Sequence, residues 1–484
     1  MYSLPDFAAI LLPSFKTYLS KLGEYMNRIN LNQFKSELTG YTEIRNQFNS
    51  TGVIRLVNGN LVSNTKDETS GISARTFKDG YWGFSSDSIV GTDTFKKVIK
   101  NANDNASNMA KYLKKNNKTL PDNNFNIEKD HIIESKRASR DEMINFLKSL
   151  DSHIETKYKN LVSRNLFLRD FSTKKDLITS FGSNSYISLC RTHIYIFMTM
   201  QSKDGPVEHY KSFGGPGLFF EQFSDPTLLH EEIDTIYKEL KEKSEGVYAK
   251  AGVKDVILAP NLAGILAHEA IGHTTEADIV LGGSIASDYI NQKVASDMVT
   301  LVDFAHTYNN ELCPLPVYID DEGVEAKDAV IIENGTLKSF MHNRDTASHF
   351  QTNTTGNARA FDFNDEPLIR MRNTVILPGT SKLDEMIESI EDGYYLMNPA
   401  NGQADSTSEF MFGVNMGYEI KNGKITKAIK DTTISGVAFD MLKTITMLSD
   451  DMQWECAGTC GKKQPMPVGM GGPAIKCQIT VGGK

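Results

Sequence analysis

The sequence predicts an α+β fold of two domains, a mixed sheet-and-helix domain followed by a β-rich domain. With 484 residues the chain is longer than one hydrophobic core usually organises. Its first half mixes apolar residues at helical spacing with runs of β-branched and aromatic residues. Its second half contains many short apolar runs bounded by turn residues, a pattern that is typical of β-structure.

The expected elements of the first half follow one another from the first residues. Residues 5–39 carry apolar positions at helical spacing, and residues 72–84 predict a hairpin that turns through Lys78-Asp79-Gly80. Residues 94–115 predict another helix. Residues 116–128 are rich in Asn and Asp and contain a proline, so they predict a surface loop.

A helical pattern returns at residues 138–160 and is followed by two predicted strands. Leu161–Leu168 is a short and mostly apolar run, whereas Ser185–Met200 is rich in β-branched and aromatic residues. This alternation of helix and strand makes the first domain α+β.

The connection between the two domains is predicted at an amphipathic helix. It starts at Asp225-Pro226, because aspartate caps a helix and proline suits its first turn. An apolar stripe and a charged face follow. We therefore expect an N-terminal domain over residues 1–225, a connecting helix over 226–244 and a C-terminal domain over 245–484.

Short apolar runs beside turn residues predict the strands of the second domain. Two of them precede Asn-Gly, a dipeptide that favours a tight hairpin turn, at Asn334-Gly335 and Asn422-Gly423. The glycine-rich stretches 213–217 and 468–472 lack the ending of a phosphate-binding loop and are predicted to be turns. The apolar runs are Val256–Leu258, Pro316–Ile319, Ala329–Ile332, Tyr418–Ile420 and Thr432–Ser435.

Charge and hydropathy exclude two classes of partner. The formal net charge is -9 and the basic residues form no long cluster apart from Lys114–Lys118, so nucleic acid is not expected to bind. No segment approaches the roughly 20 apolar residues of a membrane span. The first apolar stretch also lacks a basic leader, so we expect a cytoplasmic protein without a membrane partner.

A histidine-glutamate motif carries the clearest chemical signal. Residues 255–273 predict a strand, a turn and a helix capped by Asn261, with His268 and Glu269 on that helix and His273 after them. A metallopeptidase needs two neutral imidazoles to hold Zn²⁺, a third ligand, an open position for water and a carboxylate close to that water. The motif supplies three of these groups.

The spacing of the two histidines requires an irregular helix. In the HExxH motif the imidazoles are four residues apart, whereas here they are five apart and would lie about 140° apart on a regular helix. A π-bulge or the end of the helix absorbs the extra residue, and Gly272 is a residue type that permits either. The alternative is an amphipathic helix with two histidines on its polar face.

At these positions the sequence resembles the TldD/PmbA family, and the resemblance covers most of the chain. The match follows the pattern HExxGHxxExD through His268, Glu269, Gly272, His273, Glu276 and Asp278. Further segments that resemble the family are Gly71–Arg75, Asp79–Phe84, Asp320–Val324, Arg370–Asn373, Gly458–Lys462 and Pro467–Gly469.

The resemblance implies that the third metal ligand is Cys460, in the segment GTCGK. The chemistry agrees, because a thiolate is a strong Zn²⁺ ligand that leaves a position open for water. The chain has 5 cysteines, an odd number that does not suggest a disulfide framework. Cys456 is the rival ligand, while Cys190, Cys313 and Cys477 are expected to be small buried hydrophobes.

Two acidic residues beyond the motif are candidates for orienting the imidazoles. Glu276 and Asp278 lie within two helical turns of the histidines, where a carboxylate accepts the second N–H of a metal-bound imidazole. The alternative is a helix face of solvated carboxylates.

These observations predict a zinc metallopeptidase in which Glu269 is the general base. The resemblance implies unstructured peptide substrates, such as precursors of modified peptides or antitoxin-like proteins, that reach the site through a cavity between two subunits. It also implies a dimer, either a homodimer or a heterodimer with a PmbA-like sister subunit. The first alternative is a non-catalytic peptide-binding or regulatory subunit of such a heterodimer. The second is a regulator of DNA gyrase, which the acidic charge does not favour.

Overall fold

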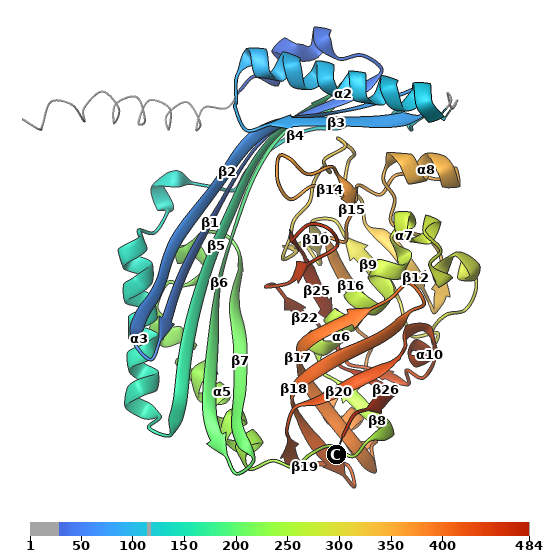
Figure 1. Cartoon of the computed structure of the whole chain (residues 1–484). Coiled ribbons are helices and arrows are strands. Elements are labelled where there is room, and N and C mark those ends of the chain that lie inside the picture. Colours follow the sequence, from blue (N-terminus) through green and yellow to red (C-terminus); the bar gives the residue numbers. More distant parts are fainter. Residues whose placement is uncertain (1–28, 114–117, 484) are drawn as a thin grey trace, which may run out of the picture.

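The structure is a computed structural model that describes residues 29–113 and 118–483. It confirms the α+β fold (Figure 1), in which a long bent sheet with its helices lies beside a body of shorter strands. Most of the helix predicted over residues 5–39, and most of the basic run Lys114–Lys118, lie outside the described residues.

A sheet of seven strands dominates the described part of the first half. Its order is β3-β2-β1-β5-β6-β4, and β7 pairs with β6. Figure 1 shows that its long strands bend between an upper and a lower part. The long strands are β1 (Tyr41–Val57), β2 (Asn60–Lys78), β5 (Leu161–Thr179) and β6 (Asn184–Ser202). The shorter strands are β3 (Tyr81–Asp87), β4 (Asn126–Asp130) and β7 (Gly205–Pro216).

Helices cover the two parts of this sheet separately. The upper part packs against η1 (Leu31–Glu37) and α2 (Thr92–Leu113) around one apolar core. The lower part packs against α3 (Arg140–Lys157) and α5 (His230–Ser244) around another. Short helical turns between them are η2 (Glu134–Lys136), α4 (Phe219–Gln222) and η3 (Pro226–Leu229).

Local sequence explains where these elements begin and end. The predicted hairpin turns at Asp79 and Gly80, whose φ angles of 52° and 92° suit a two-residue hairpin loop. Ser139 caps α3 in a reciprocal capping box with Glu142. Asp225 caps η3, which leads into α5, so the predicted helix start is confirmed.

Strand structure in the first half extends further than predicted. Part of the loop predicted over residues 116–128 is strand, because β4 finds a parallel partner in β6. The strand predicted over Leu161–Leu168 continues to Thr179, because β1 and β6 pair with it on both sides and hold its polar second half in the sheet.

Two sheets build the second half around one large apolar core. The first has the order β13-β12-β9-β16-β25-β22. The second has the order β17-β8-β26-β20-β18-β19, with β21 beside β26, and it closes on itself because β18 also pairs with β17. Their strands are β8 (Gly252–Leu258), β9 (Leu301–Phe304), β12 (Ala329–Glu333), β13 (Thr336–Leu337), β16 (Asn373–Ile376), β17 (Asp392–Ala404), β18 (Glu409–Lys421), β19 (Lys424–Ile429), β20 (Thr432–Val437), β21 (Met447–Leu448), β22 (Gln453–Glu455), β25 (Gly469–Gly472) and β26 (Ile475–Val481).

The remaining elements of this half are short. Small two-stranded ladders are β10 (Thr307–Tyr308) with β11 (Glu311–Leu312), β14 (Ala358–Arg359) with β15 (Leu368–Ile369), and β23 (Thr459–Cys460) with β24 (Met466–Pro467). The helical elements are α6 (Pro260–Leu266), η4 (Ala267–Gly272), η5 (His273–Thr275), α7 (Ala277–Leu281), η6 (Ile285–Tyr289), α8 (Arg344–Phe350), α9 (Leu383–Glu388) and α10 (Ala438–Lys443).

The structure confirms the two Asn-Gly turns and corrects three other predictions. Asn334-Gly335 and Asn422-Gly423 join β12 to β13 and β18 to β19, with positive φ at every residue. Pro316–Ile319 is not a strand, since proline has no N–H for a ladder and only an isolated bridge forms there. The glycine-rich stretches 213–217 and 468–472 are not turns: the first ends β7, and the second contains β25.

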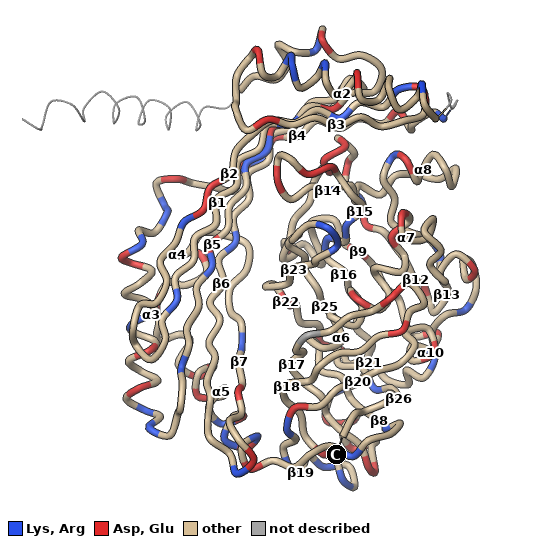
Figure 2. The backbone as a smooth tube through the Cα atoms, in the orientation of Figure 1, with Lys and Arg blue, Asp and Glu red and all other residues tan. Residues whose placement is uncertain are grey.

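A buried cluster of charged side chains joins the two halves. Arg75 of β2 pairs with Glu43 at 2.8 Å and with Glu322 of the second half. The ring of Trp82 lies 3.9 Å from the Arg75 guanidinium carbon, and Arg344 donates to the Glu322 carbonyl. Loss of one buried partner would leave an uncompensated charge, so the buried cluster around Arg75 fixes how the two halves meet. Elsewhere, charged residues gather along the outer helices α3 and α5 (Figure 2).

The domain division over residues 1–225, 226–244 and 245–484 stays a prediction. The expected connecting helix, α5, shares its apolar side chains with the core under the lower sheet. No helix within the described residues is long and apolar enough to cross a membrane.

Candidate metal centre

The motif helix begins where the central strand β8 ends. Pro260 occupies the first turn of α6, and the cap residue is Ala259, whose backbone is extended. The predicted cap at Asn261 is therefore wrong: its amide donates to the side chain of Asn398 in β17 at 2.7 Å. A Cβ on Gly264 would lie 2.9 Å from the backbone nitrogen of Gly471, so α6 packs closely on β25.

The helix changes to a π-helix at the two histidines, which is one of the two irregularities that their spacing allows. The segment η4 (Ala267–Gly272) is π-helical, and the N–H of His273 donates to the carbonyl of His268. This i→i+5 hydrogen bond places residues five apart on one side of the helix. The imidazole ring centroids lie 5.1 Å apart.

Gly272 serves this turn for a different reason from the one predicted. Its φ of -57° and ψ of -51° are ordinary for a right-handed helix, so the conformational freedom of glycine is not used. A Cβ on Gly272 would instead lie 2.0 Å from the Sδ atom of buried Met371. The glycine is required because the chain after β15 packs directly against the π-helix.

Gly272→Ala is expected to lower the free energy of unfolding by about 1–3 kcal/mol, the usual cost of overpacking a core. Chemical denaturation of the metal-free protein measures it. Gly461→Ala is the matched control, because a Cβ there meets nothing within 4 Å. Gly272→Ala should cost less in a Met371→Ala background, because the shorter side chain leaves room for the added Cβ. An equal cost in both backgrounds, or an equal loss in the control, would contradict the packing argument.

The third candidate ligand lies in a small hairpin at the far end of the sequence. Cys460 is in β23, pairs with Met466 of β24, and is 2% exposed. Arg370 holds this hairpin: its buried guanidinium donates to the carbonyl groups of Cys460, Lys462 and Gln464 at 2.8–3.0 Å.

Three predicted ligands converge. One ligand atom from each of His268, His273 and Cys460 lies within 4.8 Å of the others, and the Cys460 Sγ to His273 Nε2 distance is 3.2 Å. Burial raises the pKa of the Cys460 thiol, but the two imidazoles beside it outweigh that effect and bring the pKa to about 3. The pocket thus stabilises the thiolate, the form that binds metal.

The donor set fits a bound metal ion. Both ring nitrogens of His268 are buried, and neither has a hydrogen-bond partner among the described residues. Buried polar atoms are normally satisfied, so an imidazole without partners beside a thiolate indicates a ligand position. The rival Cys456 is not part of this cluster: its carbonyl accepts from Arg191, and burial raises its thiol pKa to about 11.

The two acidic candidates take different partners. Glu276 is fully buried and its Oε2 lies 2.7 Å from Nδ1 of His273, so with the proton on Nδ1 the imidazole donates to it. Asp278 instead accepts from Lys462 at 2.8 Å through both oxygens. The Lys462 ammonium also lies 3.2 Å from Glu276. Glu276 is therefore placed to orient His273, and Asp278 acts on the Cys460 segment.

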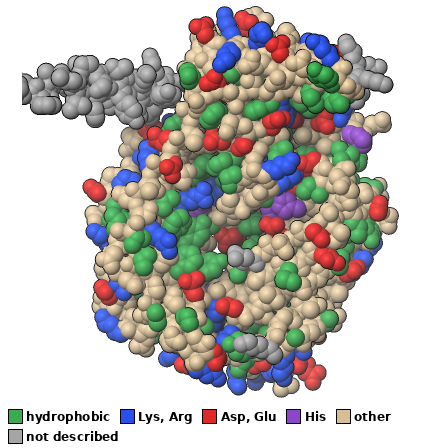
Figure 3. All heavy atoms as spheres, viewed as in Figure 1, with side chains coloured by type: hydrophobic (Ala, Val, Ile, Leu, Met, Phe, Trp, Pro, Cys, Tyr) green, Lys and Arg blue, Asp and Glu red, His purple; other side chains and the backbone are tan. Residues whose placement is uncertain are grey.

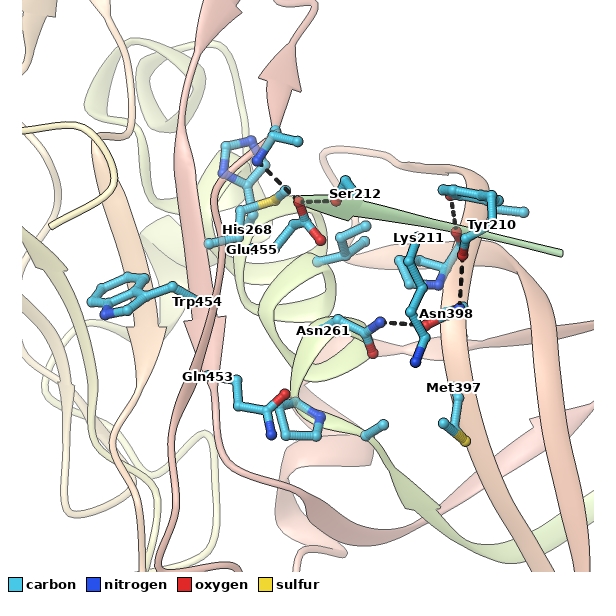
Figure 4. Close-up of a pocket in the computed structure, with 18 of the residues that line it drawn as sticks. Tyr210, Lys211, Ser212, Asn261, His268, Met397, Asn398, Gln453, Trp454 and Glu455 are labelled. Carbon is cyan, nitrogen blue, oxygen red and sulfur yellow. Dashed lines mark hydrogen bonds between the residues drawn. The ribbon is translucent and has the colours of Figure 1, made fainter. Parts of the chain in front are cut away.

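Glu269 faces both imidazoles from the wall of a cavity. Its carboxylate lies 3.9 Å from Nε2 of His268 and 3.7 Å from Nε2 of His273, and it is 30% exposed. The cavity has a volume of about 630 Å³ and lies between β7, α6, β17 and β22. Figure 3 shows a hollow between the two halves, and Figure 4 shows His268 among the residues around the cavity. A bound molecule can reach Glu269 here.

Comparison with known proteins identifies the family of this chain. Residues 251–483 match the PmbA/TldA metallopeptidase C-terminal domain, and residues 42–106 match the PmbA/TldA metallopeptidase domain 1. A metalloprotease of Methanocaldococcus jannaschii is 32% identical over 92% of this chain and 97% of its own length. The chain belongs to the PmbA/TldD metallopeptidase family.

Two further relatives of the family extend the comparison. A zinc metalloprotease TldD homolog of Saccharolobus solfataricus is 32% identical over 87% of this chain and 91% of its own length. The crystal structure of TldE from Thermococcus kodakarensis covers 94% of this chain and 98% of its own, with a TM-score of 0.73 and 17% identity. The latter likeness shows the fold.

Some residues that support the candidate site were not predicted to do so. Arg370 and Met371 lie in a segment that resembles the family, yet no spacing rule connects that segment to residues 268–273. Lys462 lies two residues after Cys460, but no local sequence pattern indicates that it binds Asp278. Only the resemblance of these segments to the family could have indicated the three residues.

Proposed function

We propose that this chain is a zinc-dependent peptidase that hydrolyses peptide bonds in unstructured peptides or small proteins. The observation that carries the proposal is the convergence of His268, His273 and Cys460, with Glu269 beside them in an accessible cavity. The names of the relatives support it, since they are metalloproteases, one of them a zinc metalloprotease.

The donor chemistry favours zinc. Two imidazoles and one thiolate are typical ligands of catalytic zinc, with a fourth position left for water. His268, His273 and Cys460 would hold the ion, and Zn²⁺ supplies the Lewis acidity that lowers the pKa of a water molecule. Glu276 fixes the tautomer and ring orientation of His273.

Glu269 is the proposed general base. Its carboxylate is partly exposed to the cavity and close to both imidazoles, so it can accept a proton from the attacking water. The same group then returns a proton to the amine that leaves.

The cavity lies between two strand edges that suit an extended peptide. Within the described residues β22 is the last strand of its sheet and β7 pairs with β6 alone. Residues of both strands line the cavity. An added strand binds through main-chain hydrogen bonds, so it selects unfolded segments before it selects sequence. Precursor peptides and antitoxin-like proteins are the substrates proposed here.

We also propose that the chain acts as a dimer, either with itself or with a PmbA-like sister subunit. The alternative function, a non-catalytic peptide-binding or regulatory subunit, predicts peptide binding without zinc.

Metal removal tests the proposal. The purified protein should contain about one zinc per chain and should cleave an unstructured peptide, alone or with a sister subunit. Dialysis against a chelator should abolish cleavage, and added zinc should restore it. Zinc-free protein that binds peptide without cleaving it, even after zinc is added, would favour the alternative.

A further inference from the structure

We propose that Glu455 makes this cavity select peptides that carry a positive charge, on a Lys or Arg side chain or at a free N-terminus. The inference rests on the proposed peptidase function and adds the class of group that the cavity prefers beside the bond to be cut. It concerns binding, so it can be tested apart from hydrolysis.

Glu455 differs from the other charged side chains of the cavity, which are Lys211, Glu232 and Glu269. The Lys211 ammonium lies 3.3 Å from Glu239 and 3.7 Å from Glu232, so Lys211 and Glu232 already have opposite charges beside them. Glu269 faces the two imidazoles. Glu455 alone among these carboxylates has no Lys, Arg or His within ion-pair distance in the described part of the chain.

Neutral donors hold the Glu455 carboxylate in place. Its Oε1 accepts from the backbone N–H of Ala457 at 2.9 Å and from the hydroxyl of Ser212 at 3.2 Å. Figure 4 shows the other oxygen pointing into the cavity. The Arg191 guanidinium donates to the carbonyl of Cys456 and does not line the cavity. Burial raises the pKa of Glu455, and the charge of Arg191 partly opposes this rise. Glu455 therefore has a fixed position and a free oxygen.

Such a carboxylate discriminates by charge. A cationic substrate group would form a charge-assisted hydrogen bond, which is stronger than a neutral one and is screened less inside a cavity than at the surface. A neutral group would leave the carboxylate without a charged partner, and an acidic group would be repelled. Phe213, Ile265 and Met470 line the same cavity and offer apolar contacts for the stem of a Lys or Arg side chain.

Glu455 is also placed to act on a peptide bound at the proposed catalytic site. It ends β22, the edge strand of its sheet, and the segment that follows it leads to Cys460. It shares the cavity with Glu269 and His268. One extended peptide can thus present a charged group to Glu455 and a peptide bond to Glu269.

Fluorescence anisotropy with labelled, unstructured peptides tests the inference. The protein is zinc-loaded Glu269→Gln, so that bound peptide is not consumed, with zinc-free protein measured in parallel. The probes are N-acetylated, C-amidated peptides of Gly, Ser and Thr with one central Lys, Gln or Glu, and an unacetylated Gln peptide that reports on the N-terminal ammonium. We expect the Lys peptide to bind about 10-fold more tightly than the Gln peptide, and the Glu peptide most weakly.

Adding Glu455→Gln should reduce the preference for Lys over Gln to less than about 2-fold, because Gln keeps an oxygen for Ala457 and Ser212 but loses the charge. Glu232→Gln is the matched control at the same cavity, and it should keep the preference because Lys211 already neutralises Glu232. Zinc content and thermal unfolding verify that each variant is folded.

Two results would overturn the role of Glu455. The first is that the Glu269→Gln protein shows no preference for the Lys peptide over the Gln peptide. The second is that Glu455→Gln and Glu232→Gln reduce this preference equally, which would mean that it arises from the overall charge of the cavity. A charge preference in a protein that never hydrolyses peptides would instead contradict only the peptidase function. Cleavage without any charge preference would contradict only the role of Glu455.

Discussion

Glu269→Gln should retain zinc and bind unfolded peptide, but cleave it about 10² to 10⁴ times more slowly than the wild type. The substitution preserves the size and polarity of the side chain and removes the group that accepts the proton. None of the three candidate ligands is changed. The loss should therefore fall on the rate of hydrolysis while metal content and peptide affinity stay the same.

The measurement compares the variant with wild type on an unstructured peptide, with any sister subunit present and zinc determined in the same samples. Glu276→Gln is an informative comparison, because it changes a carboxylate that contacts His273 from the side away from the cavity and should act mainly on zinc affinity. A Glu269→Gln variant with full metal and wild-type rate would refute the assigned mechanism.

Cys460→Ser should lose most of the bound zinc, whereas Cys456→Ser should keep it. The structure places only the first of these thiols with His268 and His273. The loss should exceed the roughly 10- to 100-fold that removal of an outer hydrogen-bond partner costs. Hydrolysis should fall in parallel.

Competition with a chromophoric chelator measures both affinities, and Cys456→Ser is the internal control because it lies only four residues away in the same segment. Retention of zinc in Cys460→Ser together with its loss in Cys456→Ser would move the third ligand to Cys456. Retention in both would remove the thiolate from the site altogether.

The parts of the fold that depend on local chemistry could be predicted from the sequence. The hairpin at Asp79-Gly80, the Asn-Gly turns and the start of the connecting helix at Asp225 each depend on one or two residues with a strong conformational preference. An irregular helix could be predicted as well, because five-residue spacing cannot place two imidazoles together on a regular helix. The sequence left a π-bulge and a helix end open, and the structure has a π-helix. The extent of β5 could not be predicted, since partners on both sides override its polar second half.

The residues that meet at the candidate site could be predicted, but the residues that support them could not. The His-Glu motif indicated His268, Glu269 and His273, and the resemblance indicated Cys460. Arg370, Met371 and Lys462 act through contacts with segments far away in the chain, which no local pattern encodes. Gly272 is an example. The sequence indicated that this glycine is needed at the irregular turn, but only the packing against Met371 explains why a larger residue does not fit.

The long separation between the ligands also bears on when the protein can become active. Cys460 and His273 are 187 positions apart in the chain. During synthesis the helix that carries both histidines therefore emerges from the ribosome long before the thiolate that completes the set, and domains generally fold as they emerge. A nascent chain that has not reached residue 460 has two of the three ligands and no hairpin for Arg370 to hold. We expect the three-ligand centre to assemble only after residue 460 has emerged, so that shorter nascent chains lack it.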